Sequence, residues 1–229
     1  MIQLSSSSLS IFNECKKCFY LDRNHKLSRP RGIFSSLPNA IDGIIKDKMD
    51  LYRGSLPPQF DVPELKGFQL YNGADFKKMR HWKTNPLKMT DSKGNTIVGA
   101  FDELLYNPTT NEYAIGDYKS KGSEPDLAYG EKYYQKQINL YSRFLEVGGK
   151  KIAPFACLFY FWAEPCESNL ITFKTKVLFL TPDTKAAEML FADAVRCLES
   201  DITPPSGESC EYCKFYSNRL QNENFAVAQ

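Results

Sequence analysis

The chain has 229 residues, of which 42% are hydrophobic and 24% are charged, and its net charge is +2 at pH 7. This length and composition are typical of one soluble globular domain, and the small net charge does not by itself mark a nucleic-acid binder. No segment approaches the ~18 apolar residues of a membrane span, and the N-terminus lacks a signal peptide. We therefore expect a cytoplasmic protein without a membrane partner.

The first expected helix runs through residues 11–20, with Ser8 as its cap, because apolar residues recur there at helical spacing. Basic side chains gather just after its start, opposed by one acid, Asp22. They include Lys16, Lys17, Arg23 and Lys26. We expect these four to contact nucleic-acid phosphates, although a solvated charged surface is an equally open alternative.

The following segments alternate between helix and strand patterns. Helices are predicted at 38–52, 129–147 and 183–198, and strands at 88–91, 96–106, 112–119, 154–162 and 170–180. The strand at 154–162 is almost continuously apolar, which is typical of a central strand covered on both faces. The order of elements predicts an α/β fold with a mixed central β-sheet flanked by helices.

The stretch from Gly99 to Tyr141 carries the candidate chemistry. Two strand-like runs joined by an Asn/Pro turn predict an antiparallel hairpin. Side chains alternate along a strand, so Asp117 and Lys119 share one face while Tyr118 points away. If Asp102 uses the same face, two carboxylates and an ammonium meet there, and buried charges must be paired or bind a metal.

Three short motifs in this stretch carry a family resemblance. They are Gly99 with Asp102, then Asp117 with Lys119, then Gln137 with Tyr141 on the following helix. Their order resembles the PD-(D/E)XK nucleases, and most of all the RecB-type exonucleases and the CRISPR adaptation nucleases. The resemblance implies a restriction-endonuclease-like core, with residues 1–229 forming a single nuclease-like domain.

The resemblance also implies roles for the acidic site. Mg²⁺ or Mn²⁺ would be held by Asp102, Asp117 and the Tyr118 carbonyl, and would activate a water for phosphodiester hydrolysis. Lys119 would orient that water and stabilise negative charge in the transition state. The alternative is a structural ion pair between Asp117 and Lys119 on the sheet.

Two further sets of residues receive roles from the same resemblance. Gln137 and Tyr141 are four residues apart, so they share a helical face, where they would brace the site and contact DNA. Asp42, on the first core helix, is our candidate for a further metal ligand, with Asp47 as the substitute. An ordinary surface acid is at least as good an explanation of Asp42.

The chain has seven cysteines, an odd number, and no sign of secretion, which argues against a disulfide framework. Four of them form two Cys-x-x-Cys pairs: Cys15, Cys18, Cys210 and Cys213. We expect these thiolates to share one metal centre, so that residues 1–35 and 200–229 form a metal-cluster subregion that joins the two termini. The others, Cys157, Cys166 and Cys197, are expected to fill the core.

The resemblance implies a [4Fe–4S] cluster, because related nucleases commonly hold one with one N-terminal and three C-terminal cysteines. This chain departs from that pattern, since Arg219 stands where a further cysteine would be expected. Cys18 would then supply the fourth ligand. A tetrahedral Zn²⁺ site also suits two Cys-x-x-Cys pairs, so the iron–sulfur cluster and zinc both stay open, and free structural thiols are the remaining alternative.

Together these features predict a metal-dependent DNA nuclease. It would act as an exonuclease or end-trimming enzyme on DNA that is single-stranded or has free ends, in repair, recombination or antiviral defence. One alternative is a non-catalytic nucleic-acid-binding module that keeps the fold as a scaffold. Another is a metalloprotein in which the cysteine site carries the function.

Overall fold

A computed structural model describes residues 1–30, 32, 36–81, 87–164 and 171–227, so that Cys166 lies outside the described part of the chain. The chain forms two compact units. One contains Met1–Ile33, Asp91–Ile97 and Met189–Gln229, and the other contains Phe34–Thr90 and Val98–Glu188. Among the described residues, none of the helices combines the length and the apolar composition that a membrane span requires.

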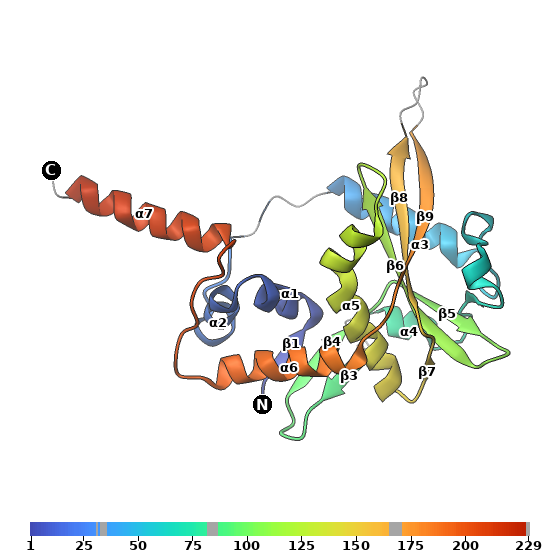
Figure 1. Ribbon diagram of the computed structural model, residues 1–229, viewed down its shortest axis with the longest axis horizontal. Coiled ribbons are helices and arrows are strands. Elements are labelled where there is room, and N and C mark those ends of the chain that lie inside the picture. The colour runs from blue at the N-terminus through green and yellow to red at the C-terminus, as the bar shows by residue number, and fades with distance from the viewer. Residues whose placement is uncertain (31, 33–35, 82–86, 165–170, 228–229) are drawn as a thin grey trace. The chain divides into compact units, whose positions relative to one another are not determined.

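The second unit is built on a mixed sheet (Figure 1). Its strands follow the order β2 (Gln69–Leu70), β5 (Glu103–Asn107), β6 (Glu112–Lys121), β8 (Ala156–Glu164) and β9 (Thr172–Leu180), with β7 (Lys151–Ile152) also beside β6. The pairs that β6 forms with β7 and β8 are parallel, and the other pairs are antiparallel. The predicted α/β class with a mixed central sheet is therefore confirmed, and β8 is an inner strand as its apolar sequence indicated.

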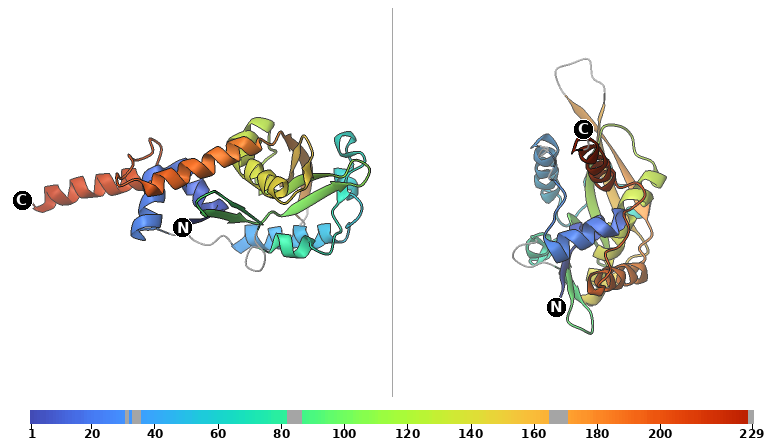
Figure 2. Two further views of the ribbon diagram at one scale, coloured as in Figure 1. Left: turned by 90° about the horizontal axis from the view of Figure 1, so that it is seen from below. Right: turned by 90° about the vertical axis from the view of Figure 1, so that its left-hand side faces the viewer.

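Helices cover both faces of this sheet (Figure 2). The parallel pair β6–β8 needs a crossover, which α5 (Leu127–Val147) supplies. This helix lies so close to the sheet that a Cβ on Gly130 would come within 3.2 Å of Leu158. The opposite face is packed against α3 (Ser36–Asp50), whose Ile45 and Met49 join the core around Tyr118.

Smaller elements complete the unit or lead out of it. They are η1 (Pro58–Phe60), η2 (Pro63–Leu65), α4 (Phe76–Arg80), β3 (Leu87–Thr90) and β4 (Thr96–Gly99). The single strand expected at 96–106 is interrupted, because β4 ends at Gly99 and β5 begins at Glu103. Asp102 therefore directly precedes β5. Asp117 and Lys119 lie inside β6 and not at its end, because pairing with β8 continues to Lys121.

The first unit contains the two chain ends. Its elements are β1 (Gln3–Ser5), α1 (Ser6–Glu14), α2 (Lys16–His25) and α7 (Glu211–Val227), and α6 (Thr184–Glu199) continues into it. The expected helix at 11–20 is two helices, because Cys15 has an extended backbone and ends α1 while it caps α2. Ser5 is the cap of α1, and Ser8 is its capping-box partner, because Ser8 Oγ accepts from the Ser5 N–H at 2.9 Å and Ser5 Oγ accepts from the Ser8 N–H at 3.2 Å.

Gly116 is required by close packing inside the sheet. It pairs with Glu103, and a Cβ there would lie 2.9 Å from Glu103 Cβ and 2.9 Å from a ring carbon of Phe159. We expect Gly116→Ala to lower the free energy of unfolding by about 1–3 kcal/mol, as overpacking does. Gly122→Ala is the control, because nothing lies within 4 Å of its added Cβ. Equal stability of the two variants in urea denaturation would contradict this account.

Candidate active site

The structure brings Asp102, Asp117 and Lys119 together. Glu103 pairs with Gly116, so the preceding residue, Asp102, comes opposite Asp117. Lys119 Nζ forms an ion pair with Asp117 Oδ2 from the same face of β6. The negative charge of Asp102 acts on both members of that pair. Two carboxylates and an ammonium therefore share one position, as the sequence pattern predicted.

Burial controls the ionisation of this group. Asp117 is only 2% exposed. Burial raises the pKa of its carboxyl, Lys119 opposes that increase and Asp102 adds to it, so that the pKa lies at about 7. Burial alone would lower the pKa of Lys119, but the charge of Asp117 raises it. Asp117 therefore changes protonation state near neutral pH while Lys119 stays charged.

Lys46 of α3 is a second ammonium at the site, which the sequence analysis missed. Its Nζ lies 2.7 Å from Asp102 Oδ1 and 2.7 Å from Asp42 Oδ2. Asp42 is thus joined to Asp102 through Lys46, whereas Asp47 is exposed. The four-residue spacing from Asp42 to Lys46 is the sequence signal for such a helical ion pair. The site holds three carboxylates against two ammoniums.

A charged network on the α3 face of the sheet holds the backbone at Asp102. Glu103 is fully buried and accepts a hydrogen bond from Arg53 Nη2 at 2.7 Å and from the Tyr118 hydroxyl at 2.6 Å. Arg80 approaches Glu103 and donates through Nε to the Asp102 carbonyl at 2.8 Å. The network therefore fixes the point where the chain enters β5.

The motif spacing pointed to Asp102 and not to its neighbour, Glu103. The available signal was a second acid in an apolar run, since an acid on a buried strand needs a partner. The partners Arg53 and Arg80 come from separate segments, and the sequence gives no sign that both approach Glu103.

Gln137 and Tyr141 lie on α5 and contact each other. Gln137 Nε2 donates to Tyr141 Oη at 3.1 Å. Tyr141 is 4% exposed, and its ring centroid lies 6.5 Å from that of Phe101, the residue before Asp102. Tyr141 therefore packs beside the segment that carries Asp102, and the expected roles of the pair in bracing the site and contacting DNA stay predictions.

The basic residues expected to bind phosphates lie on α2 or at its C-terminal cap. Lys16 and Lys26 are exposed, and Lys17 and Arg23 are half-buried. Arg23 donates to the Gln3 carbonyl, and Lys26 Nζ donates to the Arg23 carbonyl at 3.1 Å. Their contact with nucleic acid stays a prediction.

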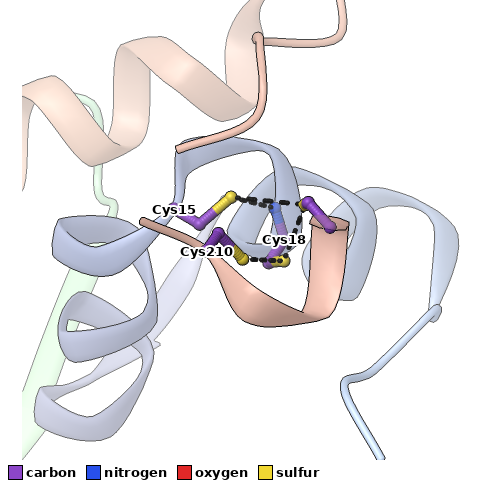
Figure 3. A group of neighbouring side chains, drawn as sticks. Cys15, Cys18 and Cys210 are labelled. Carbon is purple, nitrogen blue, oxygen red and sulfur yellow. Dashed lines mark hydrogen bonds between the residues drawn. The ribbon is translucent and has the colours of Figure 1, made fainter. Parts of the chain in front are cut away.

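The two Cys-x-x-Cys pairs meet in the first unit (Figure 3). The Sγ atoms lie 3.7 Å apart for Cys15 and Cys213, 3.6 Å for Cys18 and Cys210, and 3.6 Å for Cys18 and Cys213. All four lie within 4.8 Å of one another, close enough to share one metal. The expected joining of the N- and C-terminal regions by these cysteines is confirmed.

The surroundings of Cys15 favour a thiolate. Its Sγ accepts N–H donors from Gly207 at 3.2 Å and Cys18 at 3.5 Å. Burial would raise the pKa of the thiol, but these donors lower it to about 6. Gly207 permits this approach, because a Cβ there would lie 2.6 Å from the Glu14 carbonyl oxygen. Burial raises the pKa of the Cys18 and Cys213 thiols, so the clustering of the four sulfurs, and not the acidity of one thiol, is what enables the group to bind a metal such as zinc or an iron–sulfur cluster.

Cys157 and Cys197 are free thiols outside this group. Cys157 is fully buried in the sheet and Cys197 is half-buried, as expected for packing residues. The separations between the four clustered sulfurs also exclude disulfides, whose S–S bond is about 2.05 Å long.

Comparison with known proteins shows that this chain shares its fold with a solved structure. No protein-family model matches the chain, and a search of curated proteins finds no significant match. The crystal structure of a candidate exonuclease from Eubacterium rectale is similar to it, with a TM-score of 0.50 and 15% sequence identity. The likeness covers 93% of this chain and 87% of that one. At this identity, the comparison establishes similarity of fold alone.

The ionisation of Asp117 can be measured directly. We expect its carboxyl to titrate at a pH of about 7 in ¹³C NMR spectra of the metal-free protein. Asp102→Asn should lower this midpoint, because it removes a negative charge that opposes ionisation of Asp117. Glu112→Gln should leave it unchanged, since Glu112 lies about 17 Å away along the same strand. If Asp117 titrates at the same pH in the Asp102→Asn protein as in the wild type, then the charge of Asp102 does not influence the ionisation of Asp117.

Proposed function

We propose that this protein is a metal-dependent deoxyribonuclease of the PD-(D/E)XK superfamily, in its RecB-like branch. The observation that carries the proposal is the buried pair of Asp117 and Lys119 with Asp102 beside it. The fold that this chain shares with a candidate exonuclease supports it further. Its substrate would be DNA that is single-stranded or has free ends, trimmed in repair, recombination or antiviral defence by one nuclease-like domain spanning residues 1–229.

The donor set of the acidic site fits Mg²⁺ or Mn²⁺. Carboxylate and carbonyl oxygens are the ligands that these ions prefer, and the excess of carboxylates over ammoniums leaves negative charge for a cation to neutralise. Asp102, Asp117 and the Tyr118 carbonyl would hold the ion, with Asp42 as a further candidate ligand. When bound, it would supply a water of lowered pKa and Lewis-acid polarisation of the phosphate.

The chain's own residues supply the remaining chemistry. Lys119 stays charged, and at about 4 Å its ammonium would stabilise a unit of negative charge by about 4 kcal/mol at an effective dielectric of about 20. The Tyr134 ring lies 4.6 Å from Lys119 Nζ and limits where that ammonium can point. Arg80 and Lys46 hold the carbonyl and the carboxylate of Asp102, respectively, which orients this ligand before a substrate arrives.

Removal of either member of the buried pair should abolish cleavage. We expect Asp117→Asn and Lys119→Ala to reduce hydrolysis of labelled DNA in Mn²⁺ by at least about 100- to 1000-fold, the usual effect of deleting one charge-stabilising group. Lys174→Ala is the control, because Lys174 is an exposed lysine on β9 paired with Glu164.

Circular dichroism and thermal unfolding must show that both variants stay folded. Folded variants with full nuclease activity would refute the assignment. A wild-type protein that binds DNA without cleaving it under any divalent ion would instead be a nucleic-acid-binding module.

We also infer that the four clustered cysteines hold a single zinc ion. Around tetrahedral Zn²⁺ with Zn–S bonds of about 2.3 Å, the sulfurs lie about 3.8 Å apart. The separations of 3.6 and 3.7 Å match that spacing. In a [4Fe–4S] cluster each thiolate binds a different iron, which spreads the four sulfurs farther apart than one ion does. The spacing therefore favours zinc over the cluster implied by the resemblance.

Metal analysis and one substitution test this centre. We expect about one zinc per chain and no stoichiometric iron or sulfide, whereas about four irons with sulfide would establish the cluster. Cys210→Ser should release the metal, lower the melting temperature and expose both chain ends to protease, since metal affinity contributes to folding. Cys197→Ser, outside the group, should change none of these properties. Unchanged stability of the Cys210→Ser protein would make the cysteines ordinary packing residues.

A further inference from the structure

A row of tyrosines lies beside the candidate active site. It consists of Tyr129, Tyr133 and Tyr134 on α5 and Tyr160 on β8. The ring centroids are 4.6 Å apart for Tyr129 and Tyr133, 6.2 Å for Tyr129 and Tyr134, and 6.3 Å for Tyr134 and Tyr160. Tyr160 pairs in register with Lys119 across β6 and β8, so one end of the row reaches the buried ion pair.

The three α5 tyrosines of this row, Tyr129, Tyr133 and Tyr134, each have a lysine ammonium over the ring. The distances from Nζ to the ring centroid are 4.6 Å for Lys119 and Tyr134, 4.4 Å for Lys121 and Tyr129, and 5.1 Å for Lys132 and Tyr133. Lys119 and Lys121 come from β6, whereas Lys132 comes from α5. We name this set of four tyrosines and three lysines the tyrosine–lysine shelf.

Packing of the protein core does not explain the shelf. Tyr133 is 56% exposed, so its ring contributes little buried area. Tyr160 is fully buried, yet in the described part of the chain its hydroxyl has no hydrogen-bond partner. An unpartnered buried hydroxyl lowers stability, and a phenylalanine would pack there without that cost. The shelf therefore combines one exposed ring with one unused polar group at the active-site end.

We propose that the tyrosine–lysine shelf binds a single-stranded nucleic acid and leads it to Asp117 and Lys119. Sites for single strands combine aromatic rings, on which bases stack, with cations that follow the phosphates. The exposed face of Tyr133 offers the first stacking position, and Lys121 and Lys132 offer the charges. A duplex keeps its bases stacked on one another, so the shelf selects single strands. This inference rests on the proposed nuclease function and specifies its substrate.

The test measures binding without cleavage. The full-length protein in EDTA is titrated into fluorescein-labelled oligothymidylate of about 15 nucleotides and into a hairpin duplex of equal length. A length of about 15 nucleotides lies within the range of site sizes known for single-strand-binding domains, about 4–16 nucleotides. Tyr133→Ala should weaken single-strand binding about 5- to 150-fold, the usual effect of losing one stacking ring. Tyr133→Phe should bind within about twofold of wild type, because stacking needs only the ring, and neither variant should change duplex affinity.

Two matched changes complete the design. Tyr216→Ala removes a tyrosine on α7 that is 63% exposed, and it should leave single-strand affinity unchanged. Replacing Lys121 and Lys132 together by Ala should reduce the slope of log affinity against log salt, by about 0.7 for each phosphate that the protein no longer neutralises. A parallel titration with oligouridylate identifies the sugar, and binding of either single strand supports the shelf.

Several results would overturn the shelf. They are an absence of single-strand binding by the wild-type protein, an unchanged affinity in Tyr133→Ala, an equal loss in Tyr133→Phe, and an equal loss of duplex binding. Cleavage assays in Mn²⁺ separate this inference from the proposed function. If the protein binds single strands through the shelf but cleaves no DNA, only the nuclease proposal is refuted. If Tyr133→Ala leaves the cleavage of single strands unchanged, only the shelf is refuted.

Discussion

The register between β5 and β6 is the constraint on which the candidate site depends. Because Glu103 pairs with Gly116, Asp102 comes opposite Asp117, and Glu103 comes beside Tyr118 on the other face. A slip of one residue would move each of these side chains to the opposite face. Gly116 helps to fix the register, since its missing side chain leaves the space that Glu103 and Phe159 occupy.

Two sets of buried charges, one on each face of the sheet, hold the site in place. On one face Asp117 pairs with Lys119, and on the other Glu103 pairs with Arg53. Buried ion pairs seldom add net stability, because desolvation offsets most of their attraction. Their value here is positional, since Arg80 connects the second set to the Asp102 carbonyl. The rigid packing of α3 and α5 then keeps both sets in position.

The cysteine group imposes a separate constraint on the chain ends. Cys15 and Cys213 are 198 positions apart in sequence, yet their sulfurs are in contact. A metal shared by the two pairs would close this long loop and order α1, α2 and the start of α7 as one unit. The charged residues of the acidic site belong to the second unit, and the four clustered cysteines belong to the first.

Sequence patterns were enough to predict the α/β class, the shared face of Asp117 and Lys119, and the grouping of the cysteine pairs. The first two follow from short-range periodicity, and the third follows from the chemistry of paired cysteines, which favour a shared metal however far apart they lie in the chain. The predictions of Ser8 as a helix cap and of one strand through residue 102 were wrong, because caps and strand ends depend on competing local hydrogen bonds. The importance of Glu103 was not predicted at all. Only the tertiary structure brought Lys46 to Asp102 and both arginines to Glu103, and gathered the tyrosines beside Lys119. Such contacts join segments far apart in the chain, and no local pattern encodes which distant partner a buried charge will meet.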